Sequence, residues 1–231
     1  MAYVPAVIVF DVNGTLSDIG PLGAAFTRCG MPADSAQLWF TEILRDGFAL
    51  AAAGDNVAFA DIASDSLQRM LNNKSATSAR NNTGNTTEQA KRIMTALNDL
   101  ALHPDATDGI VALGRIAELV TLSNGAASVA EALLTRGEVR DTFSLLLSVQ
   151  DAPRWKPALQ AYEYAVRKCG KTAQEMLLVA VHPWDIHGGH AAGMRTAWIN
   201  RSGAAYPSYF AEPDIVANDL VSLAEGLCAT R

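Results

Sequence analysis

The fold class follows from one stretch near the start of the chain, Ala6-Val7-Ile8-Val9-Phe10-Asp11-Val12-Asn13-Gly14-Thr15. Five apolar residues, several of them β-branched, end abruptly at Asp11, as at the carboxyl end of a buried parallel strand. Open α/β sheets bind their ligands beyond the carboxyl ends of such strands. We therefore expect Asp11 to lie where a ligand binds.

Further short apolar runs predict more strands, and helical patterns separate them. The predicted strands are Leu119–Leu122, Phe143–Val149, Met176–Val181 and Thr196–Ile199. The predicted helices between them are Ile110–Glu118, Ala126–Arg136 and Pro157–Cys169. Strands that alternate with helices of this length form βαβ units. The sequence therefore predicts an α/β fold with a Rossmann-like parallel sheet and helices on both faces.

The region after the first strand is helical in pattern. Phe26–Leu71 carries apolar residues at mixed three- and four-residue spacings, and this periodicity resumes over Glu88–Leu102. Between them, Asn72–Thr87 is almost wholly polar and predicts an exposed loop. We expect a small helical domain, residues 17–99, inserted into a core domain made of residues 1–16 and 100–231.

The composition of the chain indicates which classes of partner to expect. Its 231 residues are 49% hydrophobic and 18% charged, and its net charge is −6. No basic excess is available to neutralise phosphates, so nucleic acid is not an expected partner. No apolar run reaches the roughly 20 residues that span a bilayer, and the first ten residues lack the basic start of a signal peptide. The three cysteines lack metal-ligand spacing. We expect a cytoplasmic protein with no membrane partner.

Polar residues follow several predicted strands and suggest a chemistry. A carboxylate such as Asp11 can act as a nucleophile when a cation keeps it ionised, and Lys156 is the candidate cation. Thr15 and Ser123 offer short hydroxyls that could position a small anion, and Gly14 allows a close backbone approach. Taken singly, each has a structural alternative: a helix N-cap for Asp11, a plain turn at Ser123 and a solvated charge for Lys156.

Four stretches in order carry a resemblance to a known family. Phe10–Leu16, Thr121–Gly125, Trp155–Pro157 and Trp184-Asp185 resemble the four motifs of the haloacid dehalogenase superfamily, and the resemblance runs from about Val7 to Ser202. A single D-x-x-G-T motif would be a weak signal, whereas four ordered motifs that each close a strand are a strong one. The resemblance implies that Asp11 is the nucleophile of a hydrolase.

Two departures separate the chain from the phosphatases of that superfamily. Those enzymes place a second aspartate two residues after the nucleophile as an acid, where this chain has Asn13, whose amide cannot donate that proton. They also carry a metal-binding carboxylate about four residues before the position of Asp185, where this chain has Val181. The chain therefore resembles more closely the metal-free (S)-2-haloacid dehalogenases, which implies no metal and no other cofactor.

This resemblance implies a reaction and a set of residues. Asp11 would attack the carbon that bears the halogen of a short 2-haloacid, and the ester would be hydrolysed by water with help from Lys156 and Asp185. The product would be a 2-hydroxy acid. The residues implied at the substrate are Val12, Asn13, Thr15, Ser123, Tyr162, His182 and Trp184, with Asn124 and Arg45 on the halide side.

Several of these assignments have a second interpretation. Tyr162 could be an ordinary helix aromatic, Arg45 a solvated helix cation and His182 a buried, satisfied histidine. His182 stands where the family has asparagine, and Ala180 where it has serine; since an imidazole can carry a charge near neutral pH, His182 could compensate for the loss or redirect the substrate.

Two rival functions follow from the same residues. One is a superfamily phosphatase that acts on a small phosphorylated metabolite, and the other is a catalytically silent relative that binds a small anion or a protein. Dimers are common among such dehalogenases, so the resemblance implies a homodimer, although the sequence itself leaves the oligomeric state open. The preferred halogen, chain length and stereochemistry of the substrate are also left open.

Overall fold

The computed structural model describes residues 3–77 and 86–229 of the chain. The chain divides into two compact units, one made of residues 1–18 and 101–231 and the other of residues 19–100. Within the described ranges, no helix is long and apolar enough to cross a membrane.

The first unit is built on a six-stranded sheet in which every pairing is parallel, with the strand order β3-β2-β1-β4-β5-β6. Its strands are β1 (Val7–Phe10), β2 (Glu118–Ser123), β3 (Phe143–Ser148), β4 (Met176–Ala180), β5 (Arg195–Ile199) and β6 (Ile215–Ala217). Its helices are α5 (Ala106–Gly114), α6 (Ala127–Arg136), α7 (Leu159–Cys169), α8 (Pro183–Ala191) and α9 (Leu220–Ala229), with 3-10 turns η1 (Arg140–Thr142), η2 (Val149–Asp151) and η3 (Ala173–Glu175). The predicted α/β fold with a Rossmann-like parallel sheet is confirmed.

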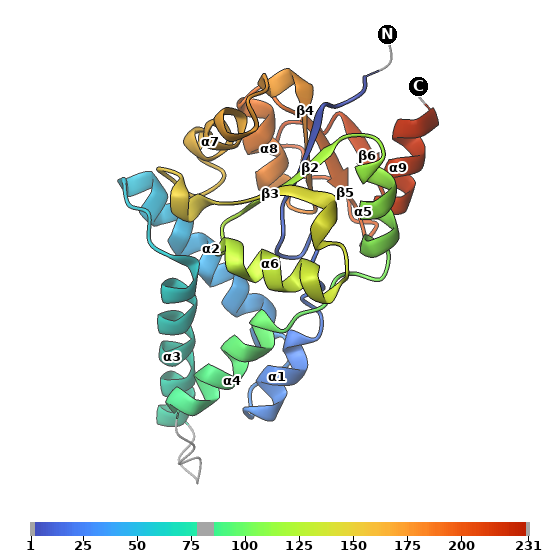
Figure 1. Cartoon of the computed structure of the whole chain (residues 1–231). Helices are drawn as coiled ribbons and strands as arrows, with labels where there is room; N and C mark the ends of the chain where they lie inside the picture. Colours follow the sequence, from blue (N-terminus) through green and yellow to red (C-terminus); the bar gives the residue numbers. More distant parts are fainter. Residues whose placement is uncertain (1–2, 78–85, 230–231) are drawn as a thin grey trace. The chain divides into compact units, whose positions relative to one another are not determined.

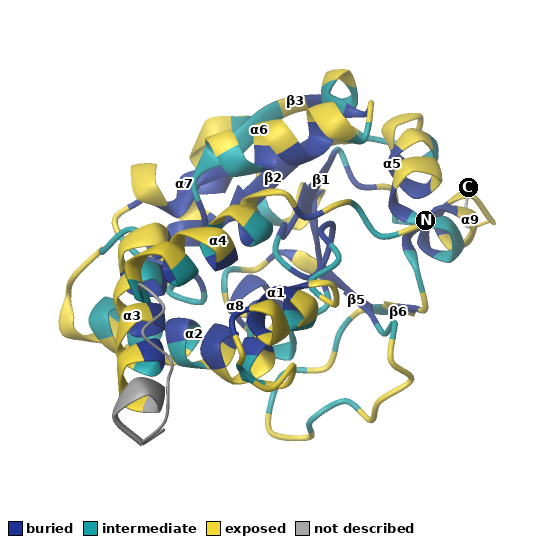
Figure 2. Cartoon of the chain, turned by 90° about the horizontal axis from the view of Figure 1, so that it is seen from below, coloured by how far each residue is buried: buried dark blue, intermediate teal, exposed yellow. Residues whose placement is uncertain are grey.

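Apolar side chains cover both faces of this sheet. One buried cluster joins Phe10, Leu119 and Val179 of the strands to residues of α5, α6 and α9, while Ala180 and Trp198 face the opposite side and pack with Ile186 of α8. Helices therefore lie on both faces, as Figure 1 shows. Strand β1 occupies the centre and is buried along its whole length (Figure 2). A strand with no polar face fits only in such a covered, central position.

The parallel register fixes which residues meet at the carboxyl edge. Phe10 pairs with Thr121 of β2 on one side and with Val179 of β4 on the other. Strand β1 ends at Phe10, β4 ends one residue after Val179 and β2 ends two residues after Thr121, so the three strands end next to one another. This edge brings Asp11, the end of β2 and the end of β4 together.

The second unit consists of four described helices, α1 (Leu22–Arg28), α2 (Ser35–Ala53), α3 (Phe59–Thr77) and α4 (Thr86–Asn98). Trp39 is fully buried: its ring lies 5.6 Å from that of Phe26, centroid to centroid, and its Nε1 donates to the carbonyl of Ala63 at 3.1 Å and to Ser66 Oγ at 3.0 Å. A buried tryptophan with a satisfied N–H is a stable anchor for a small helical core.

The observed elements differ from the predicted ones chiefly at α3, α5 and β6. Helix α3 continues to Thr77, so the predicted loop over Asn72–Thr87 does not begin at Asn72; a polar helix end is tolerated because each added residue gains one backbone hydrogen bond. Residues 78–85 of that predicted loop lie outside the described residues. Helix α5 begins at Ala106, directly after Asp105, and ends before β2 rather than running to Glu118. Strand β6 was not predicted, since it is a three-residue edge strand.

Candidate active site

Four strand ends of the first unit supply the polar side chains of one site. Asp11 follows β1, Ser123 is the last residue of β2, Lys156 lies in the loop between η2 and α7, and Asp185 lies in the first turn of α8 after β4. The carboxyl ends of parallel strands meet at one sheet edge, which is where these elements converge.

Lys156 lies between two carboxylates. Its Nζ is 2.9 Å from Asp11 Oδ1 and 2.6 Å from Asp185 Oδ2, and all three side chains are buried. The lysine backbone is held by Asn124, whose Oδ1 accepts from Lys156 N at 2.9 Å and whose Nδ2 donates to Lys156 O at 3.2 Å. Asn124 therefore fixes the ammonium between Asp11 and Asp185.

The two carboxylates differ in their pKa although they share this lysine. Burial by itself raises the pKa of Asp11, but Lys156, His182 and the hydrogen bond from Thr15 together outweigh it and leave that pKa below its usual value. For Asp185, burial and the charge of Asp11 outweigh Lys156, so its pKa is raised. Burial lowers the pKa of Lys156, yet both aspartates raise it above its usual value. Asp11 is thus ionised and suited to act as a nucleophile.

Thr15 ties Asp11 to the end of the neighbouring strand. Its Oγ1 donates to Asp11 Oδ2 at 2.6 Å and accepts from Val181 N at 3.1 Å. Gly14 allows the turn between them because its φ is +81°, a conformation that favours glycine. The hydroxyl and Lys156 hold opposite oxygens of Asp11, which fixes the plane of the carboxylate.

Tyr162 of α7 holds the second carboxylate. Its Oη donates to Asp185 Oδ1 at 2.6 Å, and the ring is fully buried. Burial, followed by the charge of Asp185, raises the pKa of Tyr162 well above its usual value. Gly188 makes room for this contact, because a Cβ there would lie 2.3 Å from Tyr162 Oη. The structure thus brings Tyr162 to the site.

His182 and Trp184 form one side of the site. The His182 ring stacks on Trp184 with centroids 5.0 Å apart, and His182 Nε2 donates to the carbonyl of Asn13 at 2.8 Å. Since a carbonyl only accepts, Nε2 carries a proton. The same Nε2 is 3.7 Å from Asp11 Oδ2, and the Lys156 ammonium lies 5.8 Å from the centroid of Trp184. These residues therefore surround Asp11, and His182 is partly exposed.

Two other predicted residues of the first unit lie at the ends of β2 and β1: Ser123 is the last residue of β2, and Val12 lies in the loop after β1. Ser123 Oγ accepts from Gly125 N at 2.9 Å. The backbone carbonyl of Val12 accepts from Leu16 N at 2.9 Å, and its side chain is buried. The turn after Asp11 is thus closed by its own backbone.

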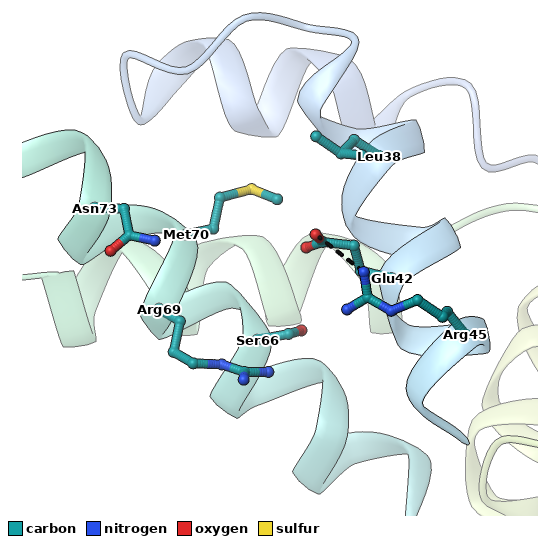
Figure 3. Close-up of a pocket in the computed structure, with 7 residues that line it drawn as sticks. All are labelled: Leu38, Glu42, Arg45, Ser66, Arg69, Met70 and Asn73. Atoms are coloured by element: carbon teal, nitrogen blue, oxygen red, sulfur yellow. Dashed lines mark ion pairs between the residues drawn. The ribbon is translucent and has the colours of Figure 1, made fainter. Parts of the chain in front are cut away.

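Arg45 belongs to the second unit, on α2. Its Nε is 2.8 Å from Asp46 Oδ1 and its Nη1 is 3.8 Å from Glu42 Oε1, and its side chain is 63% exposed. Arg45 and Glu42 line a cavity of about 350 Å³ together with Arg69 of α3 (Figure 3). The observed contacts of Arg45 are thus those of a surface ion-pair cluster.

Two side chains that were not predicted at the site, His103 and Arg201, also reach the loop after Asp11. His103 Nε2 donates to the carbonyl of Gly14 at 3.0 Å, and Arg201 Nη2 donates to the carbonyl of Thr15 at 3.1 Å. Arg201 follows a predicted strand at the same sheet edge as the other site residues, so its position after Ile199 was a usable signal. No motif marks His103.

No group of three or more His, Cys, Asp or Glu side chains that could hold a metal ion occurs among residues 3–77 and 86–229. At the site itself, the ammonium of Lys156 occupies the space between the two carboxylates that a cation would bridge. His187 and His190 are exposed on α8, and His187 Nδ1 accepts from Ala211 N at 3.0 Å. The donor set therefore does not fit a metal ion between Asp11 and Asp185.

Known proteins resemble the chain over most of its length. A haloacetate dehalogenase H-2 from Moraxella sp. (strain B) is 28% identical over 90% of this chain and 91% of its own. An (S)-2-haloacid dehalogenase from Pseudomonas putida is 26% identical over 95% of both. The fold is similar to that of an L-2-haloacid dehalogenase from Xanthobacter autotrophicus with chloropropionic acid covalently bound. The TM-score is 0.83 and the sequence identity 22%, over 98% of this chain and 100% of that one.

The family itself is identified by a broader match. The model of the haloacid dehalogenase-like hydrolases matches residues 5–193, a range that includes Asp11, Ser123, Lys156 and Asp185. The resemblance predicted from the four motifs is thus confirmed, and the chain belongs to the haloacid dehalogenase-like hydrolase family.

Proposed function

We propose that the protein hydrolyses short 2-haloacids to 2-hydroxy acids through an ester on Asp11. The observation that carries this proposal is the buried, ionised Asp11, held at 2.9 Å by Lys156 and at 2.6 Å by Thr15 at the carboxyl edge of the sheet. A carboxylate that is kept ionised and oriented in this way can act as a nucleophile. The haloacetate and (S)-2-haloacid dehalogenases similar to this chain support that reaction.

In the first step an oxygen of Asp11 attacks the carbon that bears the halogen. A carbon–oxygen bond forms, the carbon–halogen bond breaks, and the halide leaves with the electron pair on the opposite side. A halide needs no proton to depart, which agrees with an amide at Asn13. Ser123 and the backbone amides of Val12 and Asn13 would hold the substrate carboxylate, while Thr15, whose one hydroxyl hydrogen is donated to Asp11, would keep the nucleophile in place beside it.

In the second step water attacks the ester carbonyl of Asp11. Asp185 would accept the proton of that water, since its raised pKa makes it the more basic of the two carboxylates, and Lys156 would stabilise the negative charge on the carbonyl oxygen. The bond between the acyl carbon of Asp11 and the substrate oxygen then breaks, and that oxygen takes the proton back from Asp185 to give the hydroxyl group of the product. Asp11 releases its remaining proton to solvent and is regenerated as a carboxylate. The configuration is inverted, because only the first step touches the chiral carbon.

The halide side of the site is proposed on the family resemblance. Asn124 is the candidate in the first unit, and one hydrogen of its Nδ2 is engaged by Lys156 O, which leaves the second for an anion. Arg45 is the candidate in the helical unit. We propose that this unit, residues 17–99, acts as a cap domain. His182 and Trp184 would shape the site beside Asp11 and the substrate.

The rival reactions have less support. A phosphatase would need a proton donor at position 13 and a metal ion beside Asp11, whereas the chain has Asn13 and places Lys156 in that space. A silent binding protein would have no need for the fully paired set of Asp11, Lys156, Asp185 and Tyr162. We further propose a cytoplasmic homodimer, as the sequence analysis implies.

The test is halide release from a panel of short fluorinated and chlorinated 2-haloacids in the presence of a chelator. The variant is Asp11→Asn, and Asp141→Asn is the matched control because Asp141 is exposed on η1. We expect release that survives chelation, disappears in Asp11→Asn and persists in Asp141→Asn. Mass spectrometry of quenched enzyme should find the carboxyalkyl group of the substrate esterified to Asp11. Magnesium-dependent hydrolysis of phosphate esters without halide release would overturn the proposal.

A further inference from the structure

The loop after Asp11 is held from outside through four consecutive carbonyls. His182 Nε2 donates to Asn13 O at 2.8 Å and His103 Nε2 to Gly14 O at 3.0 Å. Arg201 Nη2 donates to Thr15 O at 3.1 Å, and the backbone N of His103 donates to Leu16 O at 2.9 Å. A loop whose carbonyls are all bound in this way has little freedom to shift its side chains.

Arg201 connects this loop to a distant part of the first unit. While Nη2 binds Thr15 O, Nη1 forms an ion pair with Asp105, and the second oxygen of Asp105 accepts from Leu220 N at 2.9 Å. Leu220 is the first residue of α9, and Asp105 directly precedes α5. The side chains of Arg201 and Asp105 are only 19% and 18% exposed, so solvent screens their attraction weakly.

We infer that Arg201 is a positioning residue for the nucleophile, acting through Thr15, with Asp105 as its anchor on α5 and α9. Thr15 carries both halves of this link, because its carbonyl accepts from Arg201 while its hydroxyl donates to Asp11 Oδ2 at 2.6 Å. Moving the Thr15 backbone would therefore move the donor that orients the carboxylate. The loss of rate that follows rests on the proposed function, whereas the constraint on the loop does not.

The geometry requires an arginine rather than any cation. The guanidinium binds an acceptor on each of two nitrogens in fixed relative directions, while a lysine presents a single ammonium on a flexible stem. The remaining Nε of Arg201 is buried and has no hydrogen-bond partner among the described residues. The two contacts, to Asp105 and to Thr15, are thus the ones that the side chain is placed to make.

The experiment compares Arg201→Ala and Arg201→Lys with Arg195→Ala. Arg195 also pairs with an aspartate, Asp214, but stands at the first residue of β5, away from the carboxyl edge. Hydrogen exchange of the peptide that contains residues 11–18 is measured first, because it needs no substrate. We then measure kcat and KM for a chlorinated 2-haloacid, with and without added guanidinium at concentrations that do not denature.

We expect the peptide to exchange faster in both Arg201 variants and at the parent rate in Arg195→Ala. Since a misplacement of about 1 Å at a reacting group can cost about 100-fold, kcat should fall about 10- to 100-fold while KM changes less than about threefold. Free guanidinium should restore part of the kcat of Arg201→Ala, which a merely structural role would not predict. If Arg201→Ala does not fold, Arg201→Lys and Asp105→Asn carry the same test.

Three results separate the outcomes. Unchanged exchange of the loop together with kcat within twofold of the parent would overturn the inference. Faster exchange throughout β5 and α9, with no excess in the loop and no rescue by guanidinium, would also overturn it, because Arg201 would then only stabilise the fold. If the parent enzyme releases no halide, the proposed function fails, and loop exchange alone decides whether Arg201 positions the loop.

Discussion

Replacing Lys156 by Met tests the electrostatic basis of the site. The substitution keeps most of the apolar stem but removes the ammonium that lies 2.9 Å from Asp11 and 2.6 Å from Asp185. Two buried carboxylates then face each other without a cation. Removing one partner of a buried ion pair costs about 3–5 kcal/mol, a large part of the roughly 5–15 kcal/mol by which domains are stable.

The pH dependence of stability gives the sharper expectation. In the parent protein the pKa of Asp11 is lowered, so its contribution to stability is present above the unfolded pKa and lost as the pH falls. The pKa of Asp185 is raised, so its contribution is lost as the pH rises through the folded pKa. The two effects oppose each other. In Lys156→Met both pKa values should be raised, so the folded state binds more protons and stability should fall as the pH rises above about 4.

The assay is urea unfolding of the parent, Lys156→Met and a matched control at several pH values from 4.5 to 8. Lys168→Met is the control, because Lys168 is exposed on α7 and its loss should change the free energy of unfolding by less than about 0.5 kcal/mol. Lys156→Met should lose stability progressively toward pH 8 and should form no ester. Equal losses for Lys156→Met at all pH values would refute the reasoning, since the cost would then come from packing rather than from unpaired carboxylates.

Three other changes test the division of roles. Tyr162→Phe removes the 2.6 Å hydrogen bond to Asp185 and should slow ester hydrolysis about 10-fold, because a hydrogen bond to a charged group contributes about 1.5–3 kcal/mol. Mass spectrometry of quenched samples should find more ester in the variant than in the parent, and equal amounts would contradict this role of Tyr162. Asn124→Ala removes both hydrogen bonds to the Lys156 backbone and should lower the free energy of unfolding, measured by urea denaturation, by about 1–3 kcal/mol. An unchanged free energy would show that the loop around Lys156 does not depend on Asn124. As the pH is lowered, the burst of halide release in stopped flow should persist after steady-state turnover has declined, because the pKa of Asp11 is lowered and that of Asp185 raised; loss of both together would contradict this.

The sheet and its functional edge could be predicted because the relevant residues are local in sequence. Apolar runs such as Val7–Phe10 identify buried strands, and the polar residue that ends each run marks the carboxyl edge. Asp11, Ser123 and Asp185 each come within a few residues of a strand end, so the topology alone brings them together.

The contacts across the sheet edge could not be predicted from the sequence. Asn124 was predicted on the halide side, and the structure adds that its amide holds both backbone groups of Lys156, a contact between positions 32 residues apart. Arg201 and His103 bind backbone carbonyls, and residue identity does not reveal a backbone acceptor, so the position of Arg201 after β5 indicated the sheet edge but not its contact with Thr15 O. Strand β6 has only three residues at a sheet edge, where little burial is needed to form it.

The two aspartates show why one lysine can support two different steps. Both carboxylates are buried and both bind the same ammonium. Asp11 also accepts a hydrogen bond from the Thr15 hydroxyl and lies 3.7 Å from His182 Nε2, whereas Asp185 accepts its second hydrogen bond from Tyr162. The pKa values therefore separate in the direction that the proposed reaction needs: the nucleophile stays ionised and the base that must accept a proton stays more basic. Reversing that order would make Asp11 the more easily protonated of the two carboxylates and Asp185 the weaker base, which would disfavour both steps.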